Sequence, residues 1–213
     1  MRKLAVLAVL VMFSAVSGFG QDSKAGAILD AMSAKYKNMK SFKADFTYAP
    51  VSTSGKLGRV RSGKIAVKGV KFKLNMVGQE IYNNGSDIYS FVKETNEVNI
   101  TEYDSSEESQ FSPANVYTIY KNGYKYTYKG STTISGKSYD VVELVPKNSG
   151  NMSKLEIVVD KSTKEIKRWS IWDRNSSKTV FDISSFTPNA SLSDSYFNFN
   201  TASYPGVEVV DLR

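Results

Sequence analysis

The pattern of apolar and polar residues changes once along the chain, from a helical repeat to a strand repeat. In residues 23–40, apolar side chains recur every three or four positions. Lysines gather at the end of this segment, where the helix dipole favours positive charge. From Phe42 onward, apolar and polar residues alternate, which is typical of strands with one buried face. The pattern therefore predicts one amphipathic helix followed by a β-rich region.

Turn-forming residues divide the rest of the chain into about ten strand-like segments. The Asn-Asn-Gly sequence at 83–85 is typical of a tight hairpin. Ser112-Pro113 suits a helix N-cap followed by the first helical position, and predicts a second, short helix that ends at Asn122-Gly123. The predicted strands are residues 42–48, 65–67, 70–76, 87–92, 97–103, 124–128, 139–145, 155–159, 166–172 and 179–186.

A sheet of this size must curl, because strand twist accumulates and two helices are too small to cover it flat. We therefore predict a mainly β (α+β) fold. Its curved antiparallel sheet would form an unclosed half-barrel, with the helices plugging and covering the concave apolar face. Residues 21–213 are expected to form one domain with a core of its own.

The first twenty residues have the features of a cleaved secretory signal. A positive start, Met1-Arg2-Lys3, precedes an apolar run over residues 4–13, and small residues follow up to Gly20. The run is shorter than the roughly 20 residues that span a bilayer. We expect cleavage after Gly20 and a soluble periplasmic protein. The sequence contains no Cys, so neither a disulfide nor an acylated N-terminal Cys is expected.

The residue types present favour binding over catalysis. The sequence has no His and no Cys, which excludes Ser-His-Asp and Cys-His catalysis and most zinc sites. We expect no enzyme activity, no cofactor and no metal. The acidic cluster of Glu102, Asp104, Glu107 and Glu108 is interpreted as a solvated loop, although an oxygen-ligand metal site stays open.

Two further patterns resemble nucleotide or nucleic-acid sites and are explained more simply. The Gly-rich segments 58–64 and 130–138 run into predicted strands, whereas a phosphate-binding loop runs into a helix. Lysines and tyrosines alternate at 124–129, which places them on opposite faces of a strand, so we expect no nucleic-acid partner. The net charge of +7 is compatible with transient contact with membrane surfaces.

Four segments, in the right order, resemble the LolA-type outer-membrane lipoprotein carriers. They begin with Met39-Lys-Ser-Phe-Lys-Ala-Asp-Phe46-Thr and continue through Gly63-Lys-Ile-Ala-Val-Lys68 with Phe72-Lys-Leu74. The hairpin Glu80-Ile-Tyr-Asn-Asn-Gly85-Ser-Asp-Ile-Tyr-Ser-Phe91 and the tail with Phe197-Asn-Phe199 and Pro205-Gly-Val-Glu-Val-Val-Asp211 complete the likeness.

This resemblance implies an incomplete antiparallel barrel that carries acylated lipoproteins. The expected partners are an inner-membrane ABC lipoprotein exporter and an outer-membrane receptor, and we expect a monomer. The residue pattern places many apolar side chains on the concave face, among them Leu155, Ile157, Trp169 and Ile171. Those expected to contact acyl chains are Phe46, Ile65, Val67, Phe72, Leu74, Met76 and Ile88.

The chain departs from the family where a lid is latched. The family commonly has Arg-Pro after the strand that ends here at Lys68, and this chain has Lys68-Gly69-Val70. Either Lys68 or Arg61 substitutes as the latch, or this chain has no latch. The predicted helix with Val116, Ile119 and Tyr120 would form the lid. Alternatives are an RseB-type sensor or regulator, a carrier of another lipid on the same half-barrel, and an acyl-processing enzyme.

Overall fold

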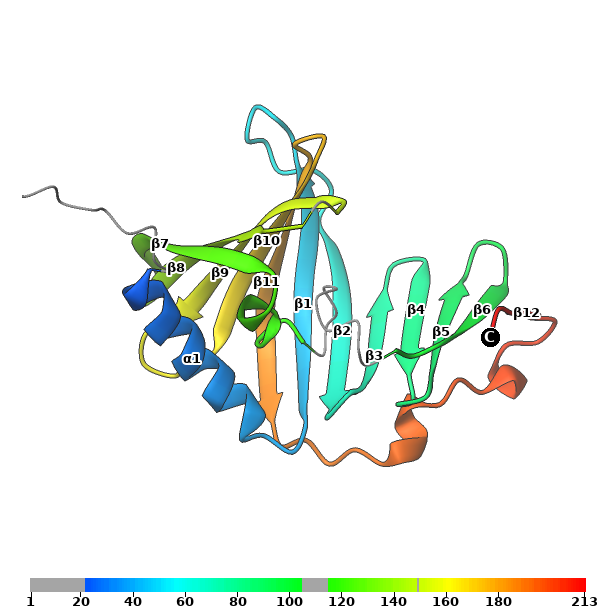
Figure 1. Cartoon of the computed structure of the whole chain (residues 1–213). Helices are drawn as coiled ribbons and strands as arrows, with labels where there is room; N and C mark the ends of the chain where they lie inside the picture. Colours follow the sequence, from blue (N-terminus) through cyan, green and yellow to red (C-terminus); the bar gives the residue numbers. More distant parts are fainter. Residues whose placement is uncertain (1–21, 105–114, 149) are drawn as a thin grey trace, which may run out of the picture.

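A computed structural model describes residues 22–104, 115–148 and 150–213, which form one 12-stranded sheet (Figure 1). The strands are β1 (Phe42–Val51), β2 (Arg61–Lys68), β3 (Lys71–Met76), β4 (Gln79–Asn83), β5 (Asp87–Val92), β6 (Glu97–Glu102), β7 (Tyr124–Ile134), β8 (Lys137–Pro146), β9 (Met152–Asp160), β10 (Ile166–Asp173), β11 (Lys178–Pro188) and β12 (Glu208–Asp211). The remaining elements are the helix α1 (Ser23–Lys37) and the 3₁₀ turns η1 (Ile119–Lys121), η2 (Asp194–Phe197) and η3 (Thr201–Ser203).

The sheet consists of two antiparallel meanders joined along β1 and β11. Its strand order is β12-β6-β5-β4-β3-β2-β1-β11-β10-β9-β8-β7, so β12 and β7 are the two edges and do not meet. Only the pairing of β12 with β6 is parallel among the described pairs. The sheet bends around α1 (Figure 1). The predicted mainly β fold with an unclosed, curved, largely antiparallel sheet is confirmed.

Three details differ from the prediction. Strands β4 and β12 were not identified: β4 is short and directly precedes the predicted Asn-Gly turn, and β12 has only four residues, mostly exposed. Helix α1 ends at Lys37 instead of residue 40. The expected lid helix is, in its described part, a turn at residues 115–118 followed by the single 3₁₀ turn η1; residues 112–114 lie outside the described chain.

Helix α1 packs against β7 and β8 on the concave face. Asp22 caps its N-terminus, accepting hydrogen bonds from the backbone N–H groups of Lys24 and Ala25. The second carboxylate oxygen of Asp22 accepts from the N–H of Tyr128 in β7, at 2.8 Å. This backbone bond, with those of the cap, lowers the pKa of Asp22. The helix is thereby fixed to the sheet edge, and Leu29 and Met32 on its buried face are fully enclosed.

The C-terminal segment covers the convex face of the other half of the sheet. Phe197 is completely buried and packs, together with Leu192, against Ala66 of β2. Further along, Phe199 and Tyr204 stack on each other with ring centroids 4.7 Å apart. They contact the aromatic side chains of β4 and β5, namely Tyr82, Tyr89 and Phe91. The segment then adds β12 beside β6 (Figure 1). No helix in the described residues is long and apolar enough to cross a bilayer.

Candidate functional site

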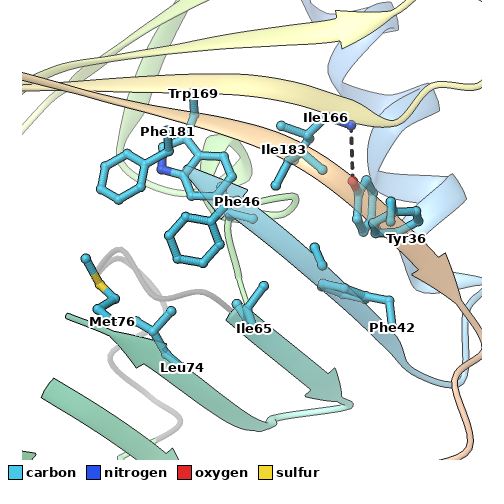
Figure 2. Close-up of a pocket in the computed structure, with 13 residues that line it drawn as sticks. Tyr36, Phe42, Phe46, Ile65, Leu74, Met76, Ile166, Trp169, Phe181 and Ile183 are labelled. Atoms are coloured by element: carbon cyan, nitrogen blue, oxygen red, sulfur yellow. Dashed lines mark hydrogen bonds between the residues drawn. The ribbon is translucent and has the colours of Figure 1, made fainter. Parts of the chain in front are cut away.

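An apolar cavity of about 270 Å³ lies on the concave face, between the middle of the sheet and the C-terminal end of α1 (Figure 2). Its walls come from β1, β2 and β3 on one side and from β10 and β11 on the other. Among the described residues, no charged side chain lines it. The lining residues are Tyr36, Phe42, Ala44, Phe46, Ile65, Leu74, Met76, Val116, Ile166, Trp169, Phe181, Ile183 and Phe186.

Two irregularities in strand pairing bring extra side chains into the cavity. The pairing register between β1 and β11 shifts between Asp45 and Phe46 of β1. Because of this shift, Ile183 and Phe186 of β11 both face the cavity although they are three residues apart. The pairing register between β10 and β9 shifts beside residue 167, so Ile166 and Trp169 of β10 also both face the cavity. Such bulges change which face a side chain occupies. Both strands therefore contribute more apolar surface than strict alternation allows.

A glycine makes room for the phenyl ring at the centre of the cavity. Gly63 of β2 pairs with Phe46 of β1, and the Phe46 ring lies over the glycine. A Cβ at position 63 would stand 2.6 Å from the Cε2 of Phe46, far inside contact distance. The missing side chain at position 63 therefore leaves the space that the Phe46 ring occupies.

The polar atoms at the cavity wall are few. The hydroxyl of Tyr36 accepts a hydrogen bond from the backbone N–H of Ile166, with 3.1 Å between oxygen and nitrogen (Figure 2). Burial raises the pKa of Tyr36 well above its usual range, so the phenol stays neutral. The Nε1 atom of Trp169 is buried without a hydrogen-bond partner in the described chain. The site is therefore suited to an apolar group.

The chain after the acidic loop covers one side of the cavity. Val116 lines the cavity, and Tyr117 stacks on Tyr36 with ring centroids 5.2 Å apart. The hydroxyl of Tyr120 donates a hydrogen bond to Asp30 of α1. The predicted lid residues Ile119 and Tyr120 are both buried in the same core. This cover is therefore attached to α1 by the stack of Tyr117 on Tyr36 and by the hydrogen bond from Tyr120 to Asp30.

Of the seven residues predicted to contact acyl chains, four line the cavity: Phe46, Ile65, Leu74 and Met76. Val67 and Phe72 are buried in the core that surrounds it and do not line it. Ile88 lies on the same face as Phe72, two strands further out, away from the cavity. Side-chain alternation identified the face correctly and did not identify where the cavity ends.

The two candidate latch residues lie on opposite faces of β2, Lys68 on the convex face with Ala66 and Arg61 on the concave face with Ile65. The Nζ atom of Lys68 contacts the carboxylate of Asp194 at 2.8 Å and the carbonyl oxygen of Leu192, both in the C-terminal segment. Arg61 is exposed at the start of β2. Of the acidic cluster, Glu107 and Glu108 lie outside the described residues, and no group of three acidic side chains is placed to hold a metal within the described chain.

Sequence reasoning missed the C-terminal wall of the cavity. Phe181, Ile183 and Phe186 were assigned to a strand and not to the site, and Ile166 was treated likewise. Their alternation is broken by the bulges, so period-two counting places Phe186 on the wrong face. Trp169 was expected on the concave face and does line the cavity. The signal that could have found this wall is its density of aromatic residues.

The chain is similar to several solved structures. An uncharacterised conserved protein from Thermus thermophilus is 10% identical, with a TM-score of 0.59 over 88% of this chain and 99% of that one. A DUF1329 family protein from Desulfovibrio piger is 16% identical, with a TM-score of 0.47 and coverage of 87% and 100%. LprF from Mycobacterium bovis is 12% identical, with a TM-score of 0.46 and coverage of 81% and 96%.

The sequence comparisons identify the family. No curated protein matches the sequence. The family model for the outer membrane lipoprotein carrier protein LolA matches residues 37–200, which include β1 to β11 and all of the cavity lining except Tyr36. The chain therefore belongs to the LolA family of outer membrane lipoprotein carrier proteins.

Proposed function

We propose that the protein is a periplasmic carrier that binds the acyl chains of lipoproteins in this cavity. It would take them from an inner-membrane ABC exporter and carry them to the outer membrane. The observation that carries the proposal is an apolar cavity, without charge among its described lining residues, in a chain of the LolA family. The cavity volume of about 270 Å³ lies just below the range of about 300–1,000 Å³ that is typical of small-molecule sites.

The cavity chemistry suits reversible capture of a hydrocarbon chain. Each methylene group transferred from water to such a site contributes about 0.8 kcal/mol. The aromatic walls formed by Phe46, Trp169 and Phe181 offer large contact surfaces that need no directional bonds. A carrier must also release its cargo, and a site without charge pairs or a covalent attachment point favours release.

The lining also supports a role in binding without catalysis. Its one hydroxyl among the described residues, on Tyr36, is neutral and hydrogen-bonded to the backbone of Ile166. No carboxylate, lysine or serine lines the cavity in the described chain. An acyl-processing enzyme would require a nucleophile or a general base near the bound chain.

The direct test is size-exclusion chromatography of the protein mixed with a triacylated lipoprotein, compared with the same lipoprotein lacking its acyl chains. We expect comigration only with the acylated form. Leu74→Glu, which places a carboxylate in the cavity wall, should abolish the complex. Val70→Glu, in the exposed turn before β3, should not, because Val70 lies outside the cavity. Equal binding of both lipoprotein forms would contradict the proposal and favour a regulator that recognises the polypeptide.

A further inference from the structure

The loop between β1 and β2 exposes aliphatic side chains at one end of the sheet. Leu57 is 52% exposed and Val60 is 53% exposed. Val77, in the turn between β3 and β4, is 65% exposed. In an antiparallel meander these two connections lie at the same end of the strands, and Figure 1 shows the β1–β2 loop projecting beyond the sheet there. This end of the sheet therefore carries three exposed aliphatic side chains.

The same loop is basic. Lys56, Arg59 and Arg61 are all exposed, and residues 50–61 contain no acidic residue. None of the three cations forms an ion pair within the part of the chain that the structure describes. We refer to these six residues as the basic-apolar rim: Leu57, Val60, Val77, Lys56, Arg59 and Arg61.

Contacts inside the loop give the rim a defined shape. The N–H of Gly58 donates to the carbonyl oxygen of Pro50 at 2.8 Å, and Leu57 forms a bridge with Val51. The N–H of Lys56 donates to the hydroxyl oxygen of Ser52. The exposed aliphatic side chains are therefore presented by a hydrogen-bonded loop.

The rim is connected to the cavity wall. Val77 directly follows Met76, which lines the cavity. The N–H of Val77 donates to the hydroxyl of Tyr48, with 3.2 Å between nitrogen and oxygen. Tyr48 in turn stacks on Phe181 with ring centroids 5.8 Å apart, and Phe181 lines the cavity. A surface bound at the rim would therefore lie beside this end of the cavity.

We propose that the basic-apolar rim is a docking surface for an anionic lipid bilayer. Aliphatic side chains that can enter the headgroup region, together with cations that attract anionic lipids, are the two features of interfacial membrane binding. The loop projects beyond the sheet, a shape that suits entry into a bilayer surface better than enclosure of a peptide (Figure 1). The inference goes beyond the proposed function and does not require that the cavity binds acyl chains.

The test is flotation with vesicles of phosphatidylcholine, with or without phosphatidylglycerol, using the chain from Gln21 onward. That chain contains every described element and lacks the apolar run at 4–13, which would itself enter a bilayer. We expect binding to the anionic vesicles only, decreasing as salt is added. Lys56→Gln with Arg59→Gln should weaken binding about fivefold for each cation removed. Leu57→Ser should weaken it about tenfold.

Matched controls separate rim binding from general stickiness. Lys37→Gln with Lys40→Gln makes the same charge change at the opposite end of the sheet, and Leu212→Ser removes a leucine that is more exposed (61%) at the β12 edge. Both controls should float like the unmodified chain. Absence of vesicle binding would overturn the proposal, as would equal loss in the control and rim variants. Acyl-chain binding, measured in solution without vesicles, should be unchanged in the rim variants.

Discussion

The indole ring of Trp169 lies parallel to the phenyl ring of Phe181, with ring centroids 5.0 Å apart and planes 9° from parallel. The two residues are paired across β10 and β11, and both line the cavity. Phe46 packs against both rings from β1. The stacked pair therefore forms one wall of the cavity, and its contacts with Phe46 join the two meanders of the sheet.

Phe181→Leu should enlarge the cavity next to Trp169 at a modest cost in stability. The smaller side chain removes half of the stacked pair, and we expect a loss of about 1–2 kcal/mol in the free energy of unfolding. Relative affinity should shift toward longer or branched acyl chains, which can use the new space. A series of fatty acids of increasing length, titrated into the variant, measures this shift.

Phe199→Leu is the matched control for that variant. Phe199 also packs among aromatic side chains, but on the convex face, away from the cavity. It should lose similar stability and keep the original chain-length preference. If both variants changed their preference equally, the cavity would not be the binding site.

Gly63→Ala should disturb acyl binding although it adds a single methyl group. The new Cβ would meet the Cε2 atom of the Phe46 ring at 2.6 Å and push the ring into the cavity. We expect a destabilisation of about 1–3 kcal/mol and weaker binding of long chains. Gly150→Ala, where a Cβ would have no heavy atom within 4 Å, should be neutral in both measurements. Unchanged binding by the Gly63 variant would show that the Phe46 ring does not shape the site.

Attachment of the C-terminal segment should depend on pH through Glu80. Burial acts to raise the pKa of Glu80, but bonds from Lys93, Tyr82 and Tyr204 outweigh it, so the pKa lies below its ordinary value of 4.5. A lowered pKa in the folded state stabilises the fold above the ordinary pKa. This contribution is lost as the pH falls below 4.5 and through the lower folded value.

Urea unfolding between neutral and acidic pH checks this prediction. Glu80→Gln cannot ionise, so its stability should fall less between neutral pH and acid than that of the unmodified protein. Asp45→Asn is the comparison variant, because it removes an exposed carboxylate 3.9 Å from Lys64. Its loss of stability between neutral and acidic pH should be nearly the same as that of the unmodified protein. If Glu80→Gln lost as much stability in acid as the unmodified protein, Glu80 would not be the group responsible.

Tyr120→Phe should loosen the cover of the cavity. The variant keeps the buried ring and removes the hydrogen bond to Asp30, at an expected cost of about 1 kcal/mol. Acyl chains should then bind and dissociate faster, with little change in equilibrium affinity, because the cavity wall itself is intact. Stopped-flow measurement of both rates decides the point. Unchanged rates would mean that this contact does not limit entry.

Much of the fold could be predicted because alternation along the strands is regular. The faces of β1, β2 and β3 follow from period-two counting, and Phe46, Ile65 and Leu74 were placed correctly in the cavity wall. Strand β12 could not be predicted, because its four residues are mostly exposed and its parallel partner β6 is more than a hundred residues earlier.

The C-terminal wall of the cavity was beyond sequence reasoning for a physical reason. A bulge is a property of the pairing between two strands, and neither β10 nor β11 shows in its own sequence where the register shifts. The role of Lys68 was missed similarly, because its partner Asp194 follows 126 residues later in a segment without a repeating pattern.

The central claim is that an acyl chain occupies this cavity, and quenching of Trp169 by a brominated fatty acid tests it most directly. The chain has two tryptophans, and Trp172 lies on the other face of β10, between the amines of Lys154 and Lys178. In a Trp172→Phe background, emission from Trp169 should be quenched in a saturable manner. In a Trp169→Phe background, emission from Trp172 should stay unchanged. Equal quenching of both tryptophans, or quenching of neither, would contradict acyl binding in the cavity.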